Sequence, residues 1–302
     1  MNHSFIWFRN SKRLSYLPFS SHPFSILSIT YKTAIMKNSN QRISVLIYSI
    51  TIISFFFGFQ TNLSAQDRSV TSYQYRRVPN DKIDEFVKRE TTYWTKVAQK
   101  AVDNKTMSFW ALLEKVGGYD LPNSSNYLFI NTFPDIDKAG SMWNASDIEK
   151  TAGVKMTDME DYSFTTVTSE FFLHGREWVQ SAKAVAAKDY NYVEMVYHNT
   201  DNPDSLINLE KKYWGPFIKG AMDKGQTPQV AWGNAIVLAP MGDNIKFTTV
   251  SYDLYKTLGD ALMPVWDPKV VFPNDGLGMI GKLEIGRRGI AIYRVVKVVS
   301  AP

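Results

Sequence analysis

A five-residue pattern that occurs twice constrains this chain more than any other feature of its sequence. Glu-x-x-Tyr-Trp spans residues 90–94 and returns at residues 210–214, an offset of 120. The same offset, within two residues, aligns further pairs on either side: Tyr73 with Tyr192, Phe86 with Leu206, Val97 with Phe217, and Trp110 with Trp232. A sequence that matches itself over this length predicts two copies of one structural unit.

Each copy shows the same order of local patterns. Stretches rich in Tyr and Val predict strands over 72–78 and 191–198, and Asn80 and Asn202 then open helices with apolar residues three and four apart. The first copy continues with predicted strands over 108–116, 126–133 and 170–179 and a helix over 136–143. The second continues with predicted strands over 230–239, 245–251 and 289–299 and a helix over 254–262.

This order of strand, helix, strand, strand, helix and strand is that of the split βαβ, or ferredoxin-like, unit. Two such units in one chain, assigned to residues 66–185 and 186–302, resemble the dimeric α+β barrel superfamily. The resemblance implies an α+β fold in which two ferredoxin-like βαββαβ repeats pair as one barrel within the chain, and therefore a monomer. The longer segments 144–162 and 264–283 are expected to form loops and short helices over one barrel mouth.

Residues 36–65 have the pattern of a secretory signal peptide. A basic start at Lys37 and Arg42 precedes an uncharged apolar run over 43–59, and cleavage is expected after Ala65. The alternative is an uncleaved membrane anchor, for which the run is short. Residues 1–35 lack this pattern and are interpreted as a start codon assigned too early. We therefore expect a periplasmic or secreted protein with no stable membrane insertion after cleavage.

The charge distribution argues against a nucleic-acid partner. Six of the 34 basic residues and none of the 29 acidic residues precede residue 66, so the remainder carries 28 − 29 = −1. A chain without a basic excess does not neutralise a phosphate backbone. The sequence has no cysteine, which excludes disulfides, thiol nucleophiles and Cys-ligated metals.

Candidate ligand-binding residues follow from the alternation of side chains along the predicted strands. Residues two apart share a face, which groups the candidates as Tyr75 with Arg77, His174 with Arg176, Tyr192 with Glu194 and His198, and Trp232 with Asn234. If the tyrosine-bearing faces line the barrel interior, they form a cavity lined by phenols and a few charges. Such a cavity suits a small apolar or aromatic ligand.

Plainer interpretations of the same residues stay open. Trp232, like Trp94, Trp110 and Trp214, can simply pack a helix on the sheet, and Arg176 can form a salt bridge with Glu177 or a neighbouring strand. No metal site is predicted, because Glu194 and His198 lie about 13 Å apart on one strand. The Gly-x-Gly-x-x-Gly pattern at 276–281 does not follow an apolar strand, so no dinucleotide site is expected there.

Two functions are compatible with these residues. The first is an exported protein without catalytic activity that binds a small apolar or aromatic ligand, or a partner, in the barrel cavity. The alternative is an oxygenase-type enzyme that uses the same cavity, either without a cofactor or with haem. The resemblance implies haem in some relatives, and His174 or His198 would then be the axial ligand. A purely structural protein with a filled barrel is the third possibility.

Overall fold

The computed structural model describes residues 68–117, 124–140, 144–242 and 245–300. The predicted signal peptide 36–65 and the extension 1–35 lie outside these ranges. Within them, no helix combines the length and the apolar composition that crossing a bilayer requires.

The first half of the described chain runs from β1 to β4. Its elements are β1 (Val70–Arg77), η2 (Asn80–Lys82), α2 (Ile83–Arg89), η3 (Glu90–Trp94), α3 (Thr95–Asp103), β2 (Phe109–Lys115), β3 (Tyr127–Phe133), α4 (Ile136–Ala139), α5 (Ala145–Ala152), α6 (Met156–Met159) and β4 (Thr166–Gln180). Helix α7 (Ala186–Asp189) leads to the second half.

The second half runs from β5 to β8. Its elements are β5 (Tyr192–His198), α8 (Pro203–Leu209), η5 (Glu210–Trp214), α9 (Gly215–Lys224), β6 (Gln229–Ala239), β7 (Thr249–Tyr255), α10 (Leu258–Leu262), α11 (Asn274–Leu283) and β8 (Gly289–Ser300). The repeated Glu-x-x-Tyr-Trp pattern therefore forms η3 and η5, and both are π-helical turns between two α-helical segments.

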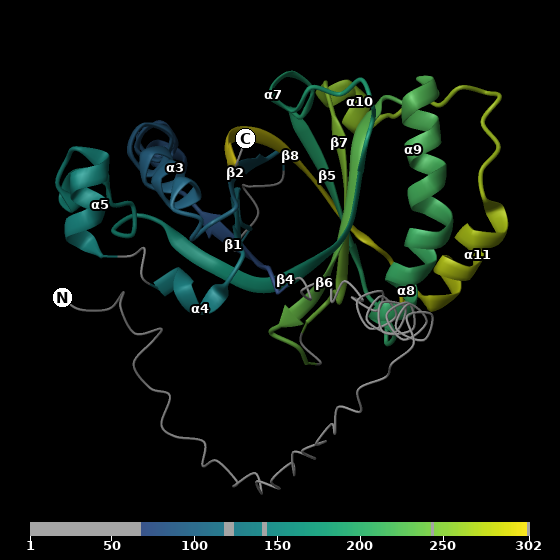
Figure 1. The fold of residues 1–302 in the computed structure, drawn as a ribbon, viewed down its shortest axis with the longest axis horizontal. Coiled ribbons are helices and arrows are strands. Elements are labelled where there is room, and N and C mark those ends of the chain that lie inside the picture. The colour runs from purple at the N-terminus through teal and green to yellow at the C-terminus, as the bar shows by residue number, and fades with distance from the viewer. Residues whose placement is uncertain (1–67, 118–123, 141–143, 243–244, 301–302) are drawn as a thin grey trace, which may run out of the picture. The chain divides into compact units, whose positions relative to one another are not determined.

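The eight strands of the described chain form one closed antiparallel barrel, with helices on its outside (Figure 1). Neighbouring strands follow the order β4-β1-β3-β2 in the first half and β8-β5-β7-β6 in the second. The pairs β2–β8 and β4–β6 join the halves and close the circle. The predicted α+β class and the predicted barrel are confirmed.

The inward faces of the strands fill the barrel with aromatic side chains. Tyr73, Tyr75 and Tyr293 are buried there in one cluster with Phe171. The Tyr75 hydroxyl donates to the Tyr197 hydroxyl at 3.0 Å, and the Tyr197 and Tyr293 hydroxyls are 3.4 Å apart. Because these phenols satisfy one another, the inward face of Tyr75 belongs to a packed core.

The helices cover the outer face of the sheet unequally. In the first half, Phe86 of α2 packs on Tyr127 and Phe129 of β3, with ring centroids 4.7 and 6.0 Å apart. These rings belong to a large buried apolar cluster that also contains Trp110 and Leu112 of β2. In the second half, the matching buried cluster consists of Ile218, Met222 and Trp232. The interpretation of Trp232 as a packing residue is thus supported by its place in the fold.

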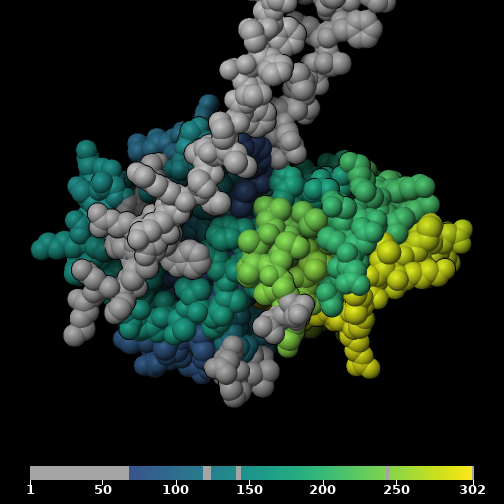
Figure 2. All heavy atoms as spheres, turned by 90° about the horizontal axis from the view of Figure 1, so that it is seen from below, coloured from purple at the N-terminus to yellow at the C-terminus, as the bar shows by residue number. Residues whose placement is uncertain are grey.

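The two longer segments cover helices, so the prediction that they lie over a barrel mouth is wrong. Ile148 and Ala152 of α5 pack against Trp94 and Val97 at the junction of η3 and α3. Helix α11 packs against α8 and η5 in the same way in the second half. In Figure 2 the yellow residues of this segment lie at the surface beside the green residues of the second half. Each segment buries apolar residues that a helix exposes on its outer side.

The boundary between β7 and α10 also differs from the prediction. The strand begins at Thr249 instead of residue 245, and the helix begins at Leu258 instead of residue 254. Leu254 stays in the strand because it pairs with Val193 of β5 and Ala231 of β6. The helix starts after Thr257, whose side chain accepts a hydrogen bond from the Asp260 amide as an N-cap.

The Gly-x-Gly-x-x-Gly pattern lies within α11, where its glycines have unequal roles. A Cβ at Gly276 would come closer than 3.0 Å to the Tyr213 ring, whereas a Cβ at Gly278 would meet no atom within 4 Å. We expect Gly276→Ala to destabilise the protein by about 1–3 kcal/mol, because the added methyl overpacks the contact with η5. Gly278→Ala is the matched control and should stabilise it by about 0.5–1 kcal/mol, through helix propensity. Urea unfolding at pH 7 measures both, and equal effects would contradict this packing role.

Candidate active site

The layer between sheet and helices has a different chemistry in the two halves. Arg76 at the end of β1 lies opposite Tyr127 of β3, and His198 at the end of β5 lies opposite Thr249 of β7. Two residues further along the outer face, the first half has Phe129 and the second has Ser251. Aromatic rings in one half thus correspond in register to short hydroxyl side chains in the other. Buried polar groups in place of core packing point to a functional site.

His198 is the centre of this polar layer. The residue is 2 % exposed, and both ring nitrogens are engaged. Nδ1 lies 2.6 Å from Glu284 Oε1, and Nε2 lies 2.8 Å from Ser251 Oγ. Burial lowers the pKa of His198 below its ordinary value, with the hydrogen bond to Glu284 opposing that shift. The neutral ring therefore donates from Nδ1 to the carboxylate and accepts the Ser251 proton at Nε2.

Glu210, the first residue of η5, is a buried carboxyl beside this histidine. It is 5 % exposed, and its Oε1 lies 3.9 Å from His198 Nε2. Its Oε2 accepts a hydrogen bond from Asn234 Nδ2 at 2.8 Å. Burial raises the pKa of Glu210 to about 7, and the Asn234 hydrogen bond opposes the shift. A carboxyl with such a pKa can act as a general base near neutral pH.

Two further groups make the layer unusual. Thr249 is 1 % exposed, and its hydroxyl has no hydrogen-bond partner within the described residues. Burial raises the pKa of Asp253 well above its ordinary value, helped by the negative charge of Glu194 across the strand pair. A buried hydroxyl without a partner lowers the free energy of unfolding by about 1–3 kcal/mol, so stability does not explain why Thr249 is present.

The first half has a carboxyl at the matching π-turn position, but its surroundings are ionic. Glu90 is 3 % exposed, and burial raises its pKa, as does the neighbouring Asp161. Arg76 Nη1 donates to both carboxylate oxygens of Asp161, at 2.9 and 3.1 Å. The guanidinium carbon also lies 4.5 Å from the Phe129 ring centroid. A permanently charged arginine paired with Asp161 holds this cluster together and has no proton to exchange.

The structure brings His198 of β5 and Asn234 of β6 into one site. His198 contacts Ser251 and lies beside Glu210, and Glu210 accepts a hydrogen bond from Asn234. Trp232 lies beneath α9 on the same outer face of β6.

The expectation that Tyr192 and Glu194 face the barrel interior is wrong. They alternate with Val193 and Met195, which occupy the interior cluster. Arg77 donates from Nη1 to the Ser124 carbonyl at 2.8 Å, at the end of β1.

His174 and Arg176 line a pocket of about 360 Å³, together with Ile207 and Lys211 of the neighbouring helices. This pocket borders the polar layer, because the Glu177 amide in its wall donates to Asn234 Oδ1 at 3.0 Å. Alternation along β4 predicts that His174 shares a face with Trp178 as well as with Arg176, and for Trp178 this is wrong. A register shift between Gly175 and Glu177 reverses the alternation, and Trp178 packs near Tyr252 instead.

The predicted salt bridge of Arg176 forms with Asp204 of α8, at 2.7 Å, and not with Glu177 or a strand. Glu177 is paired instead with Lys211 of η5, at 2.6 Å. Both pairs link β4 to the helix layer.

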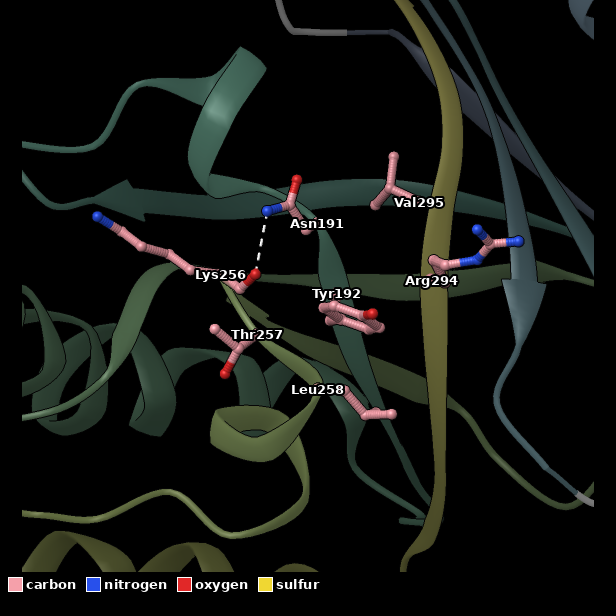
Figure 3. A pocket seen from close by; sticks show the side chains of 7 residues that line it. All are labelled: Asn191, Tyr192, Lys256, Thr257, Leu258, Arg294 and Val295. Atoms are coloured by element: carbon pink, nitrogen blue, oxygen red, sulfur yellow. Dashed lines mark hydrogen bonds between the residues drawn. The ribbon is translucent and has the colours of Figure 1, made fainter.

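Tyr192 lies in a third location, a shallow pocket of about 460 Å³ on the outer face of β5 and β8 (Figure 3). Lys256 and Arg294 also line it, but Figure 3 shows their charged ends pointing in opposite directions. Lys256 pairs with Asp189 at 3.1 Å and Arg294 with Glu114 at 2.9 Å. The pocket therefore brings no set of charges to one point.

Sequence reasoning missed Ser251 and Glu284, and it treated Glu210 only as part of the repeat. Ser251 follows from the register of β5 and β7, whereas Glu284 comes from the segment after α11. Among the described residues, no group of three His, Asp or Glu side chains is placed to hold a metal ion. The only signal for Ser251 was its position on the outer face of a predicted strand.

Comparisons with known proteins place the chain by its fold. No protein-family model and no curated protein matches it. A protein named as a candidate monooxygenase from Lactobacillus acidophilus superposes with a TM-score of 0.50 at 8% identity, over 77% of this chain and 96% of that one. An anthrone oxidase-like protein gives 0.48 at 13% identity, over 78% and 94% of the two chains. A haem-binding protein from Thermus thermophilus gives 0.41 at 8% identity, over 75% and 90%. At such identities the likeness concerns the fold alone: this chain is a mixed α+β protein with a closed antiparallel barrel, like the dimeric α+β barrel proteins.

Proposed function

We propose that the protein is an exported enzyme of the oxygenase type, which acts without a bound cofactor on a small, partly aromatic molecule. The observation that carries the proposal is Glu210, a buried carboxyl whose pKa of about 7 suits proton abstraction at neutral pH. The candidate monooxygenase with the same fold agrees with this reaction class by analogy only. Binding without catalysis is the alternative, and the layer would then be a polar ligand site.

In this proposal the chain supplies the base, and the substrate and dioxygen supply the electrons. Glu210 takes a proton from an activated C–H or O–H group of the substrate, and Asn234 keeps the carboxylate oriented through its hydrogen bond. The resulting anion transfers its electrons to dioxygen. An activated CH₂ group then becomes a carbonyl: one oxygen atom enters the product, and the other leaves as water with the two hydrogens. The pocket bordered by Glu177 and Lys211 is the approach to the layer.

Of the two candidate histidines, His174 and His198, only one suits haem ligation. His198 has both nitrogens in hydrogen bonds and does not suit an axial ligand. His174 Nδ1 is bonded to the Ser69 carbonyl at 2.8 Å, the arrangement that orients the other nitrogen of a ligating histidine. If haem were bound, His174 would hold its iron, and the haem would supply the chemistry of dioxygen activation.

Two further proposals concern the chain as a whole. The shared strand order and the two π-helical turns support an origin by duplication of one ferredoxin-like unit, over 66–185 and 186–302. Closure of the barrel within one chain supports a monomer that needs no second copy to complete its sheet. Residues 36–65 carry the proposal of export to the periplasm or beyond, with cleavage after Ala65.

Oxygen uptake by the purified protein tests the enzymatic proposal. With aromatic C–H acids such as 1,8-dihydroxyanthrone, we expect uptake above the spontaneous rate, increasing with pH through about 7 as Glu210 ionises. Glu210→Gln should lower kcat by about 10²–10⁴-fold, because the amide cannot accept the proton. Glu90→Gln, at the matching π-turn, is the control and should keep the wild-type rate.

Two results would count against the oxygenase proposal. One is a folded Glu210→Gln variant with the wild-type rate. The other is saturable binding of these compounds, measured by calorimetry, with no oxygen uptake by the wild type. The latter would favour the binding function.

A further inference from the structure

We propose that Ser251 is an activated nucleophile, held with His198 and Glu284 in a hydroxyl–imidazole–carboxylate relay that reacts with small acyl or phosphoryl electrophiles. This activity goes beyond the proposed oxygenase function, because it makes no use of Glu210. The three residues come from β7, from β5 and from the segment after α11.

The geometry of the three side chains is that of a serine triad. Ser251 Oγ lies 2.8 Å from His198 Nε2, and His198 Nδ1 lies 2.6 Å from Glu284 Oε1. Both distances are within hydrogen-bond reach of a nucleophile and its base, and of the base and its orienting carboxylate. Arg288 Nε donates to the two Glu284 oxygens at 2.6 and 2.8 Å, which holds this carboxylate in place.

The unpartnered Thr249 hydroxyl supplies a second, independent observation. Thr249 is two residues from Ser251 on the same outer face of β7, and it lies opposite His198. Its hydroxyl is the one buried side-chain group of the described residues that lacks a hydrogen-bond partner. A free donor beside a nucleophile can stabilise the oxyanion that forms when Ser251 attacks. This role would account for a hydroxyl that otherwise only reduces stability.

The first half shows that a buried serine beside a carboxylate does not by itself make this arrangement. Ser72 is 4 % exposed and donates to Glu170 Oε1 at 2.8 Å, with no imidazole between them. Its proton already goes to a carboxylate, which is a weak base at neutral pH. Ser72 is therefore an internal control with similar burial and no relay.

Access to Ser251 runs past the segment that carries Glu284. Ser251 is 5 % exposed, and the Glu284–Arg288 pair lies at the edge of the layer, with the Arg288 side chain 44 % exposed. The Ile285 amide donates to the Asn199 carbonyl at 2.8 Å and holds this segment against the end of β5. A reagent therefore has to be small, or has to enter as the segment moves.

The step is balanced within the three residues and the electrophile. Ser251 Oγ forms a bond to the acyl carbon or to phosphorus, and its proton passes to His198 Nε2. The bond between the acyl carbon or phosphorus and the leaving group breaks. The leaving group departs with the electron pair of that bond and takes the proton from His198. For a fluorophosphonate the products are the phosphonylated Ser251 and fluoride with one proton.

Labelling of the full-length protein by a small alkyl fluorophosphonate, followed by intact mass and peptide mapping, tests the proposal. We expect one adduct per chain, on Ser251, and none on Ser72. Ser251→Ala should abolish the adduct. Glu284→Gln should slow labelling by about 10²-fold or more, since the imidazole loses its orienting carboxylate. In the wild type the rate should increase with pH and level off once His198 is neutral, and Glu90→Gln, in the first half, should keep the labelling.

Several outcomes would overturn the proposal. One is no adduct on the folded wild-type protein under conditions that label a serine hydrolase completely. Others are an adduct on Ser72 as well as Ser251, or a labelling rate that Glu284→Gln leaves unchanged. Circular dichroism of each variant separates loss of the relay from loss of the fold. Because labelling requires the Ser251 hydroxyl and oxygen uptake requires the Glu210 carboxyl, failure of either proposal leaves the other one testable.

Discussion

Glu210→Gln is expected to make the folded protein more stable than the wild type at pH 8, by about 3 kcal/mol, and to leave stability at pH 4 nearly unchanged. The folded-state pKa of about 7 lies above the ordinary value of 4.5, so the folded state holds the Glu210 proton more tightly than the unfolded chain does. The favourable contribution is complete below pH 4.5 and is lost as the pH increases to about 7. The amide side chain of the variant stays neutral at every pH, and its oxygen can still accept the Asn234 hydrogen bond.

Urea unfolding of both proteins at pH 4 and pH 8 measures this difference. The comparison between variant and wild type isolates Glu210, because the other titrating groups are shared. A stability difference that is the same at both pH values would show that Glu210 is not a high-pKa carboxyl. It would also remove the basis for its role as a base near neutral pH.

Arg76→Leu is expected to destabilise the protein by about 3–5 kcal/mol, because it leaves Asp161 as a buried charge without its partner. Arg76 is 8 % exposed and Asp161 is 1 % exposed, so water cannot replace the lost ion pair. The double variant Arg76→Leu/Asp161→Leu should recover part of the loss, since no unpaired charge remains.

Arg176→Leu is the matched control for Arg76. Its ion pair with Asp204 is similar in length, but the Arg176 side chain is 34 % exposed and that of Asp204 is 64 % exposed. We expect a change below about 1 kcal/mol. Urea unfolding at pH 7 measures all three variants. A loss for Arg76→Leu no greater than for Arg176→Leu would contradict the role of the buried pair.

The contrast between the halves bears on why one of them carries the candidate site. Glu90 and Glu210 occupy the same place in the two π-helical turns. Beside Glu90, an arginine and an aspartate form a fixed ion pair with the aromatic layer around them. Beside Glu210, a neutral histidine, a serine and an amide replace those groups. Only the second set contains groups that can exchange a proton near neutral pH.

Most of the local structure and the fold class follow from the amino-acid sequence without coordinates. Alternation along the strands placed Tyr75 on one face and grouped Tyr192, Glu194 and His198 on another, because successive side chains of a strand point to opposite sides. The repeat located both π-helical turns, although it did not predict their π-helical form. Which face pointed inward was not available from the pattern. Both faces of β5 carry a tyrosine and an aliphatic residue, and only the pairing of the strands into a closed barrel decided which face points inward.

The composition of the candidate site, in contrast, depends on contacts between distant parts of the chain. Ser251 is 53 residues from His198 and Glu284 is 86 residues from it, and no local pattern relates positions so far apart. The β5–β7 register sets the first contact, and the return of the chain after α11 sets the second. The shift between Gly175 and Glu177, which moved Trp178 to the other face, likewise depends on pairing with β6. The periodicity of the sequence determines which side chains share a face. Residues far apart in the sequence come close only when the barrel closes and the helices pack on it, and the free energy of those contacts is not contained in any local pattern.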